Sequence, residues 1–346
     1  MKKILVWLSG WVDSAVAAYL LKEQWYEVVA GFMKNYVDEE NPNCSTYKDA
    51  SEAIKVAKFL WIEILSFDLR QEYEDKIIKY IYDGYQKWIT PNPDILCNTL
   101  IKFDVFLDKA IDAWFDWIAT GHYARIEKIW DNYKLLRWVD YNKDQTYFLS
   151  WLNQHQLSKA LFPIGWMTKP EVRELAKKVW LPNAERPDSQ WLCFVWKVPM
   201  RTFLKKRLQI KKWDIVLMDW TKVWEHDWAY FFTIWQSRGL DINKKAFVVK
   251  IDVEKNLVYV SYDKYEPELI TRHIEVKDWH WIWQEYDLPL ECTTKIRYRQ
   301  EPNPSTMEIK DWKTYFSYNQ DQRWVAKWQS VVAYLWDECL WWGIIE

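Results

Sequence analysis

Glycine is scarce in this sequence. Only 7 of the 346 residues are glycine, whereas an average share of ~7% would give about two dozen. The shortage excludes glycine-rich linkers and low-complexity segments, and it leaves tight turns short of the residue that best tolerates a left-handed backbone. Tryptophan shows the opposite deviation, with 28 residues.

Cysteine is too scattered to form a structural framework. The count is odd and no CxxC pair occurs; the five residues are Cys44, Cys97, Cys193, Cys292 and Cys339. This pattern excludes a disulfide-rich scaffold and a zinc knuckle, and we expect no metal site. Individual reactive thiols are the alternative that it leaves open.

Long hydrophobic runs and a strong net charge are also absent. The opening "MKKILVWLSG" has a short apolar stretch that ends before Asp13, too short for a membrane span and without a signal-peptide cleavage pattern. We therefore expect a buried strand there and a cytoplasmic protein that does not enter a membrane. The formal net charge of −2 argues against a uniformly basic nucleic-acid binder but allows a local basic face.

Many of the tryptophans stand at predicted helix ends and turns. Trp25, Trp61 and Trp180 each end a helical run, and Trp220 and Trp312 follow Asp in turn-like segments. These are positions that favour glycine. Our hypothesis is that many were encoded by UGA, read as glycine in the source organism but translated as Trp. The alternative is a natural Trp-rich protein with its indoles in a core or on a binding face.

Strand and helix patterns alternate over the first ~120 residues. The predicted strands are residues 4–8, 27–33, 62–67 and 118–120, and the predicted helices are 14–24, 45–60, 71–86 and 98–113. This α/β alternation predicts a parallel, doubly wound sheet with helices on both faces and a ligand crevice at the carboxyl ends of the strands.

The texture changes near Met200. Segments such as "DIVLMD", "LVYVSY" and "KTYFSY" are short, alternating and rich in β-branched or aromatic residues, which indicates antiparallel strands in small, mostly-β domains. We predict domains at 1–205, 206–270 and 271–346, the last a β-barrel. A basic run near the first boundary could grip phosphates or form a solvated helix face; it comprises Arg201, Lys205, Lys206, Arg207, Lys211 and Lys212.

The stretch "SGWVDS" joins the first strand to the first helix. Such a junction points backbone N–H groups and the positive end of a helix toward a phosphate. It lacks GxxxxGK[ST] and so is not a Walker loop. With Trp11 replaced by Gly it would be SGGVDS, which resembles the PP-loop of ATP pyrophosphatases. A plain strand-to-helix turn is the structural alternative.

Two stretches offer nucleophilic thiols. In "TPNPDILCN", Asp94 and Cys97 stand just ahead of a predicted helix, whose N-terminus would lower the pKa of the thiol. In "DSQWLCF", Cys193 lies about a hundred residues further on, which suggests a two-thiol mechanism if the fold brings the two together. The alternative is that each is a buried apolar residue.

Two more stretches are polar beside the predicted crevice. "ATGHYAR" places Gly121 and His122 just after a strand, and "NKDQTYFL" offers Lys143, Asp144 and Gln145. A histidine in such a place is either a surface residue or part of the site at the carboxyl end of the strand.

The ordered set of motifs resembles the tRNA-specific 2-thiouridylase family over nearly the whole chain. The motifs are SGxVDS, FMKN, TPNPDILCN, ATGHY, KDQTYFL, DSxxxCF, RYRQ and the final GIIE. The resemblance implies an N-terminal PP-loop ATP pyrophosphatase domain that adenylates the C2 oxygen of the wobble uridine in tRNA. Sulfur then comes from a cysteine persulfide and gives 2-thiouridine. It also implies ATP with Mg²⁺, and an upstream persulfide donor protein.

The resemblance assigns roles residue by residue. Cys97 matches the nucleophile, Cys193 the persulfide-bearing cysteine and Asp94 the acid or base. The ATP-binding matches are Trp7, Leu8, Ser9, Gly10, Trp11, Val12, Asp13, Ser14, Met33 and Gly121. The positions matching contacts with the target base and tRNA are Asn92, Pro93, Asp94, His122, Lys143, Asp144, Gln145, Arg297, Tyr298 and Gln329.

Tryptophan departs from the family pattern at Trp7, Trp11, Trp191 and Trp328. As literal tryptophans, these residues would block close approach to a phosphate and strain several turns, at ~1–3 kcal/mol each. We therefore expect a literal-Trp chain to fold poorly or to lack ATP binding. Other PP-loop adenylating enzymes, or an inactive tRNA-binding protein if the tryptophans are real, are the alternative functions.

Overall fold

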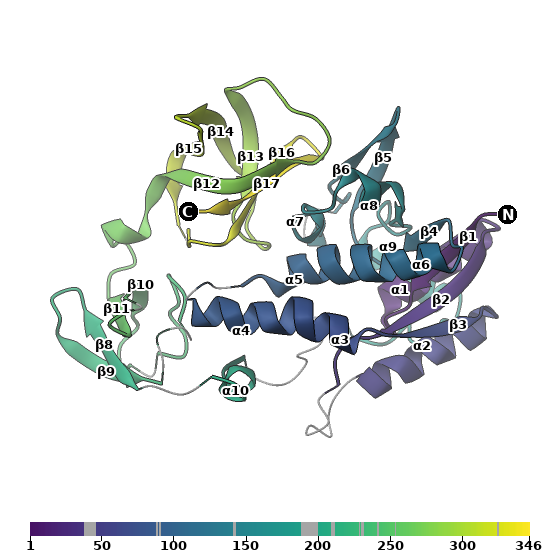
Figure 1. Ribbon diagram of the computed structural model, residues 1–346, viewed down its shortest axis with the longest axis horizontal. Coiled ribbons are helices and arrows are strands. Elements are labelled where there is room, and N and C mark those ends of the chain that lie inside the picture. Colours follow the sequence, from purple (N-terminus) through teal and green to yellow (C-terminus); the bar gives the residue numbers. More distant parts are fainter. Residues whose placement is uncertain are drawn as a thin grey trace.

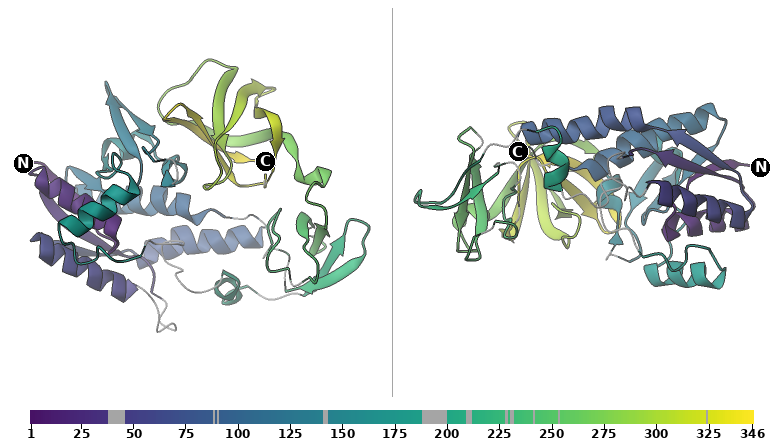
Figure 2. Two further views of the ribbon diagram at one scale, coloured as in Figure 1. Left: turned by 180° about the vertical axis from the view of Figure 1, so that it is seen from behind. Right: turned by 90° about the horizontal axis from the view of Figure 1, so that it is seen from below.

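A computed structural model describes residues 1–37, 46–87, 89, 91–140, 143–187, 200–208, 212–227, 229, 232–240, 242–252, 254–323 and 325–346. The described strands form three sheets. The N-terminal sheet lies at one end of the molecule, and most strands of the other two sheets lie toward the opposite end (Figures 1 and 2). Cys44, Cys193, Trp191 and Lys211 are outside the described residues.

The first sheet is parallel throughout, as predicted. Its strands run in the order β3-β2-β1-β4-β7, with bounds β1 Lys3–Trp7, β2 Glu27–Lys34, β3 Ile64–Asp68, β4 Trp117–Ala119 and β7 Ala160–Leu161. The central strand is covered on both faces: Leu5 packs into one hydrophobic cluster and its neighbours Ile4 and Val6 into another. A continuous apolar run is what such a doubly covered strand requires.

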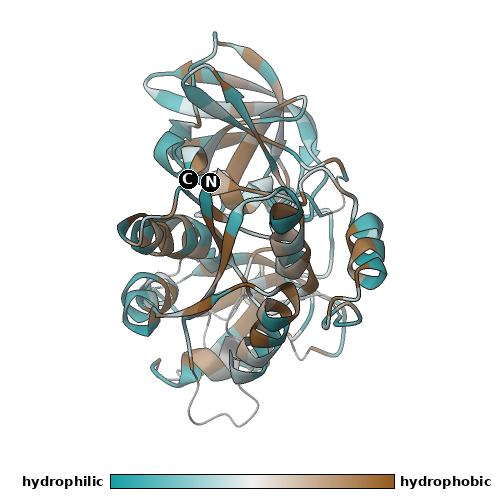
Figure 3. Cartoon of the chain, turned by 90° about the vertical axis from the view of Figure 1, so that its right-hand side faces the viewer, coloured by the Kyte–Doolittle hydropathy of each residue, from teal (hydrophilic) through white to brown (hydrophobic). Residues whose placement is uncertain are grey.

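Helices cover both faces of this sheet. On the face of Ile4 and Val6 lie α1 Val12–Glu23, α2 Thr46–Leu60 and α9 Lys169–Lys178. The other face carries α3 Arg70–Tyr73, η1 Glu74–Ile78, α4 Lys79–Gln86, α5 Pro93–Leu96, η2 Cys97–Val105 and α6 Phe106–Asp112. The helices are part brown and part teal in Figure 3, as amphipathic helices that bury one face should be.

Shorter elements complete this part of the chain. They are the hairpin β5 Arg125–Ile129 and β6 Asn132–Leu136, the helices α7 Thr146–Leu149 and α8 Gln154–Ser158, and α10 Met200–Lys205. Helix α8 begins with a reciprocal capping box between Asn153 and Gln156. Among the described residues no helix is long and apolar enough to cross a membrane.

The second sheet contradicts one expectation. It contains β8 Trp213–Leu217, β9 Lys222–His226, β10 Phe247–Asp252 and β11 Leu257–Ser261, in the order β10-β11-β8-β9. The outer pairs are antiparallel as predicted, but β11 pairs with β8 in parallel, with Val258 opposite Ile215. Alternating side chains indicate a half-buried strand but carry no information on its direction.

The third sheet closes into the predicted barrel. After η5 Pro267–Leu269, its strands are β12 Thr271–Trp281, β13 Leu290–Lys295, β14 Asn303–Lys310, β15 Lys313–Gln322, β16 Ser330–Leu335 and β17 Glu338–Ile345. A pairing between β12 and β17 closes the six strands into a ring. Unexpectedly, β6 extends this sheet through β17, with Leu135 opposite Cys339. The bounds of the three domains stay predictions.

The tryptophans in turns adopt the left-handed backbone. Of thirteen described non-glycine residues with positive φ, ten are Trp25, Trp61, Trp114, Trp130, Trp180, Trp220, Trp235, Trp312, Trp328 and Trp336. After α2, Trp61 N–H donates to Lys58 O and Ile62 N–H donates to Ala57 O. These two bonds form a Schellman motif, and Trp61 occupies its left-handed residue, where glycine is the usual choice.

Candidate active site

The loop between β1 and α1 is held tightly from within. The backbone N–H of Ser9 donates to Ser14 Oγ (3.2 Å), and Ser14 Oγ donates to Trp11 O (2.9 Å). Gly10 has φ of +82°, and a Cβ there would lie 2.4 Å from Asp49 O. The carbonyl of Gly10 accepts from Asn183 Nδ2 at 2.9 Å. Gly10 is therefore the residue that the loop cannot replace.

The prediction of backbone strain at Trp11 is wrong. Trp11 has φ of −89° and ψ of 159°, an extended conformation open to any residue, at the N-cap of α1. Its ring centroid lies 3.8 Å from the guanidinium carbon of Arg186. Trp7 also has no left-handed backbone, whereas Trp328 does, with φ of 70°.

The end of β4 approaches the start of α1 closely. A Cβ on Gly121 would lie 2.6 Å from both Asp13 C and Ser14 N, so only glycine allows this contact. In the first turn of α1, Asp13 Oδ1 accepts from Tyr123 OH at 2.6 Å and from Lys169 Nζ at 2.5 Å. The structure thus brings together the predicted ATP residues Gly10, Asp13, Ser14 and Gly121.

Met33 lies on β2, and its side chain is buried in the same hydrophobic cluster as Leu5. Two residues further on, Asn35 is only 1% exposed. Neither Oδ1 nor Nδ2 of Asn35 has a hydrogen-bond partner among the described residues.

The thiol of Cys97 does not begin a helix, contrary to the prediction. Asn92 is the N-cap, α5 starts at Pro93, and Cys97 continues that helix as the first residue of η2. The pKa argument from a helix N-terminus therefore does not apply to Cys97, since the effect is confined to the first turn. Cys97 is 2% exposed.

Asp94 lies in the first turn of α5 and is partly buried. Burial raises the pKa of its carboxyl to about 6, and the charge of Lys102 opposes the rise. A pKa near neutrality suits a group that must both accept and donate a proton.

A buried lysine lies one turn beyond Cys97 in the π-helix η2. Lys102 is 3% exposed. Its Nζ donates to Asn98 Oδ1 at 2.8 Å, lies 3.4 Å from His122 Nε2 and stands 4.1 Å from the ring centroid of Trp7. This ammonium group therefore links the ends of β1 and β4 to the helix that carries Asp94 and Cys97. π-Helical turns often mark such functional places.

His122 is buried within this cluster. Its Nδ1 lies 2.7 Å from Thr120 Oγ1, and its ring packs beside Phe103 and Phe162. Burial, together with the charge of Lys102, holds the pKa of His122 well below its ordinary value. His122 is therefore neutral at physiological pH, and its predicted contact with tRNA stays a prediction.

The "KDQTYFL" segment joins the first domain to the barrel. Tyr147 OH donates to Ser330 O at 2.9 Å, and the rings of Phe148 and Tyr298 lie 4.3 Å apart. Gln145 Oε1 accepts from Tyr123 N–H at 2.8 Å. Asn98 Nδ2 donates to Phe148 O at 3.2 Å, which connects this segment to the helix of Cys97.

Asp144 does not present its carboxylate to solvent. It is 1% exposed and pairs with Arg137 Nε at 3.2 Å. It also accepts from Thr146 Oγ1 at 2.8 Å and from the Trp138 N–H. A direct contact of this carboxylate with tRNA does not fit this arrangement, because its lone pairs are already used. Lys143, in the same segment, is partly exposed.

The barrel turns a basic loop toward the helix of Asp94. Tyr298 follows β13, and burial raises its pKa to about 12, with smaller contributions that include the charge of Asp94. Arg297 is partly buried, and burial lowers its pKa. Gln329, which precedes β16, has a buried Oε1 without a described hydrogen-bond partner. Of these barrel residues, Tyr298 is the one whose pKa responds to the charge of Asp94, and the predicted contacts of all three with tRNA stay predictions.

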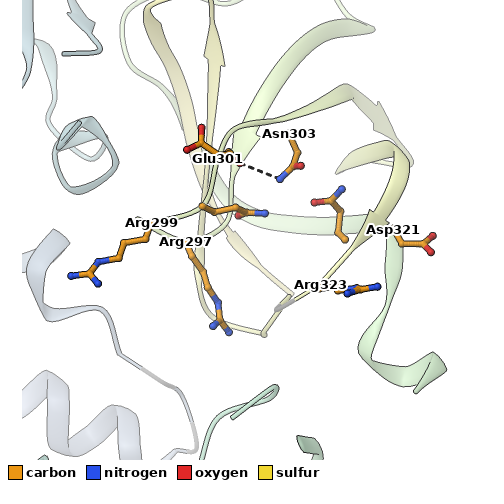
Figure 4. Close-up of a pocket in the computed structure, with 8 residues that line it drawn as sticks. Arg297, Arg299, Glu301, Asn303, Asp321 and Arg323 are labelled. Carbon is orange, nitrogen blue, oxygen red and sulfur yellow. Dashed lines mark hydrogen bonds between the residues drawn. The ribbon is translucent and has the colours of Figure 1, made fainter. Parts of the chain in front are cut away.

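A hollow of ≈ 540 Å³ opens beside this loop (Figure 4). Its lining includes Arg297 and Arg299 from the loop and Arg323 just after β15. The lining also has two acidic residues, Glu301 and Asp321, and Asp321 pairs with Arg272 at 2.7 Å. With three arginines against two carboxylates, the lining has a net positive charge, which suits a phosphate.

The remaining candidates are placed away from this cluster or outside the described residues. Lys205 pairs with Asp227 at 2.7 Å, and Arg207 pairs with Glu74, so these two cations of the basic run already have partners. Burial raises the pKa of Cys292 to about 11 and that of Cys339 well above its ordinary value, so neither is a reactive thiol.

Sequence reasoning missed Lys102, Asn98 and Asn35. Lys102 stands in "LIKFDVF" between two apolar residues, and that position on the buried side of the helix is a signal that could have found it. Asn98 is only the first residue of a predicted helix in the sequence, and Asn35 is only part of the FMKN motif. Their burial depends on tertiary packing, which local patterns do not give.

Comparison with known families accounts for nearly the whole chain. Family models described as the tRNA methyl transferase HUP domain, PRC-barrel domain and aminomethyltransferase β-barrel domain match residues 2–197, 201–262 and 271–345. Together they agree with the predicted fold class, a parallel α/β domain followed by small β domains.

Curated relatives match along their full length. The tRNA-specific 2-thiouridylase MnmA of Lactiplantibacillus plantarum is 40% identical over 356 residues, covering 99% of this chain and 95% of the relative. That of Flavobacterium johnsoniae is 37% identical over 395 residues, covering 100% of both. Among solved structures, the U34-tRNA thiolase NcsA from Methanococcus maripaludis aligns with 55% of this chain and 60% of its own, at 19% identity and a TM-score of 0.38. On the identity and coverage of its curated relatives, the chain belongs to the tRNA-specific 2-thiouridylase family.

Proposed function

We propose that this protein is a sulfurtransferase that converts the wobble uridine of tRNA to 2-thiouridine at the expense of ATP. The observation that carries the proposal is the convergence of three elements. Gly121, next to His122, lies against Asp13 and Ser14 of the loop, and Lys102 joins His122 to Asn98 on the helix of Asp94 and Cys97. Phe148 connects that helix to Tyr298 of the barrel loop. We place this reaction in the cytoplasm.

The loop after β1 fits the phosphates of a nucleoside triphosphate. Gly10 and Gly121 leave no room for a Cβ, so backbone rather than side chains lines this place, at the N-terminus of α1. Such a place favours phosphate oxygens. ATP supplies the adenylyl group that turns the C2 oxygen of uridine into a leaving group. Mg²⁺ would enter on the phosphates, since no group of three metal-ligating side chains occurs among the described residues.

Two cysteines would complete the sulfur transfer. An upstream persulfide donor protein loads Cys193, whose outer sulfur attacks C2 as AMP leaves. The thiolate of Cys97 then attacks Cys193 Sγ and breaks the bond between the two persulfide sulfurs. The products are 2-thiouridine and a disulfide between Cys97 and Cys193. Cys97 is buried in the described state, which protects it from oxidation until its partners arrive.

Asp94 is our candidate for the proton transfers. Its pKa of about 6 allows both protonation states near neutral pH. Asn92 and Pro93 precede it at the start of α5, where they would contact the target base. Single-stranded anticodon bases can be extruded at lower cost than paired ones.

The barrel would hold the tRNA backbone. Arg297, Arg299 and Arg323 line one hollow of the barrel. Contacts between arginine and phosphate position a nucleic acid without reading its sequence. Tyr298 stands between Arg297 and Arg299 in the chain, and Gln329 is a further candidate for a polar contact.

Thiolation in vitro tests the proposal. The protein is incubated with ATP, a persulfide source and a tRNA that has uridine at the wobble position, and 2-thiouridine is measured by mass spectrometry of the nucleosides. Cys97→Ala and Cys193→Ala should abolish the product, whereas Cys292→Ala, a buried cysteine of the barrel, should retain it. Activity that survives both of the first two substitutions would contradict the two-thiol mechanism.

The rival functions give different readouts in the same assay. Pyrophosphate release without 2-thiouridine would favour another adenylating enzyme. Retention of tRNA without pyrophosphate release would favour an inactive tRNA-binding protein, which a literal-Trp chain allows.

The Trp7 ring lies 4.1 Å from Lys102 Nζ and occupies space at the end of β1. Trp7→Gly combined with Trp11→Gly should therefore increase ATP affinity, and unchanged affinity would contradict this steric argument.

The codons test the decoding hypothesis directly. UGA codons at Trp11, Trp25 and Trp61, or glycine at these positions in the native protein by mass spectrometry, are the expected result. UGG codons at the three positions would overturn it.

A further inference from the structure

The side chain of Asn35 is buried and lacks hydrogen bonds. It is 1% exposed, and neither Nδ2 nor Oδ1 finds a partner among the described residues. A buried amide in this state is unfavourable, because it has lost its hydration and gained nothing in return. Such a group in a folded protein calls for an explanation, and a ligand that fills its donor and acceptor is one.

The backbone around Asn35 is fixed on both sides. Leu69 N–H donates to Lys34 O at 3.0 Å, and Thr46 Oγ1 donates to Tyr36 O at 2.7 Å. The amide therefore stands on a held segment rather than on a loose loop. A ligand would meet it without a large ordering cost.

Asn35 stands beside the phosphate loop at the carboxyl edge of the sheet. Leu8 N–H, at the start of the loop, donates to Gly31 O at 2.9 Å, so β2 and the loop run side by side. On the other side of β1, the space near the end of β4 is taken by His122, Lys102 and the Trp7 ring. A nucleotide with its phosphates on the loop would thus extend over the end of β2, where Met33 and Asn35 follow each other.

We propose that Asn35 recognises the adenine base of the nucleotide, with Nδ2 donating to a ring nitrogen and Oδ1 accepting from the 6-amino group. Adenine presents an acceptor and a donor side by side, and a side-chain amide matches that pair with two hydrogen bonds. The inference rests on the proposed use of ATP and adds the residue that selects the base.

Asn35→Leu tests this role, because leucine has a similar size and no hydrogen-bonding group. Binding of ATP is measured by calorimetry without tRNA, and the melting temperature is measured with and without ATP. We expect the melting temperature without ATP to rise and the affinity for ATP to fall about tenfold or more, as the loss of two hydrogen bonds to a ligand predicts.

Thr314→Val is the matched control. Thr314 lies in the barrel, is 0% exposed, and its Oγ1 also lacks a described hydrogen-bond partner. The change should raise the melting temperature in the same way and leave ATP affinity unchanged. A fall in the melting temperature of the Asn35→Leu protein would instead show a structural role and overturn the proposal.

A nucleotide without the 6-amino group separates base recognition from indirect effects. Purine riboside triphosphate should bind the unsubstituted protein more weakly than ATP, and the difference should vanish in Asn35→Leu. Equal loss for both nucleotides would overturn the assignment to the 6-amino group, and so would a raised KM for tRNA with unchanged ATP affinity. If the unsubstituted protein binds no ATP, the proposed function itself is wrong. If Asn35→Leu and the unsubstituted protein bind ATP equally tightly, only the role of Asn35 is wrong.

Discussion

Asp94 and Asp144 lie in neighbouring regions of the same domain and differ in what surrounds them. Asp144 is buried at the junction with the barrel, where its carboxylate accepts from Arg137, Thr146 and the Trp138 N–H. Asp94 is partly buried at the start of α5, and burial rather than hydrogen bonding dominates its electrostatics. The carboxylate of Asp144 is held by hydrogen bonds and an ion pair, whereas burial dominates the surroundings of Asp94.

The difference separates a structural acid from a chemical one. A carboxylate that accepts hydrogen bonds from several neighbours holds those neighbours in place. A carboxylate that burial pushes to a pKa of about 6 can exchange a proton near neutral pH. Both residues stand in motifs that the sequence marked as functional, so only their surroundings tell the roles apart.

Asp94→Asn should show the largest effect on activity. The amide keeps the size of the side chain but cannot transfer a proton, so we expect thiolation to fall by ~10²–10⁴-fold. The melting temperature should not decrease. Asp104→Asn is the matched control on the neighbouring helix, since Asp104 pairs with Lys76 at a partly exposed position. Full activity of Asp94→Asn would remove Asp94 from the chemistry.

Asp144→Ala should show the largest effect on stability. Removal of the carboxylate takes away the buried ion pair with Arg137, at a cost of ~3–5 kcal/mol in the free energy of unfolding. Urea denaturation provides the measurement. The double variant Arg137→Met with Asp144→Leu should lose much less, because it removes both charges. Equal losses in the two proteins would mean that packing, and not charge, explains the effect.

The pH dependence of stability should also distinguish the two residues. Asp94 holds its proton in the folded state up to a pKa of about 6, whereas the unfolded chain releases it near the ordinary value. Stability due to this group is therefore highest below pH ~4 and is lost, by up to ~3 kcal/mol, as the pH rises through ~6. Asp94→Asn should lack this fall. A fall that persists would assign it to another group.

Tyr147→Phe probes the junction that Asp144 supports. The change removes the hydroxyl that donates to Ser330 O in the barrel and leaves that buried carbonyl unsatisfied, at ~1–3 kcal/mol. Differential scanning calorimetry would measure the loss. If Tyr147→Phe instead left stability unchanged and lowered activity, the hydroxyl would belong with Asp94 on the chemical side of the comparison.

Much of the fold could be predicted from the sequence because its signals are local. The apolar run "ILV" in β1 and the periodic helices gave the parallel sheet, and alternating strands gave the barrel. The parallel pairing of β8 with β11, and the addition of β6 to the barrel, could not be predicted. Both are contacts between distant segments, and the pattern of one strand does not indicate which other strand it pairs with.

The candidate site divides in the same way. The loop around Gly10 and the approach of Gly121 follow from residue types at a strand end. The burial of Asp144 and the cluster around Lys102 depend on how helices and barrel pack, which no single segment encodes. Trp11 shows the limit most directly: its neighbours suggested a strained turn, but its backbone is extended.

An exposed turn remote from both carboxylates should give the smallest effect and a baseline for the others. Trp61 is 90% exposed, and its φ of 53° is left-handed, so glycine relieves backbone strain there without removing packing. We expect Trp61→Gly to stabilise the protein by ~1 kcal/mol in urea denaturation. Trp166→Gly is the control: Trp166 is 66% exposed but is not among the residues with positive φ, so glycine there should bring no gain. Equal changes in the free energy of unfolding at the two positions would mean that exposure of the indole, and not the left-handed backbone, governs the change. Changes as large as that of Asp144→Ala would mean that turn strain and burial of a charge do not differ in size here.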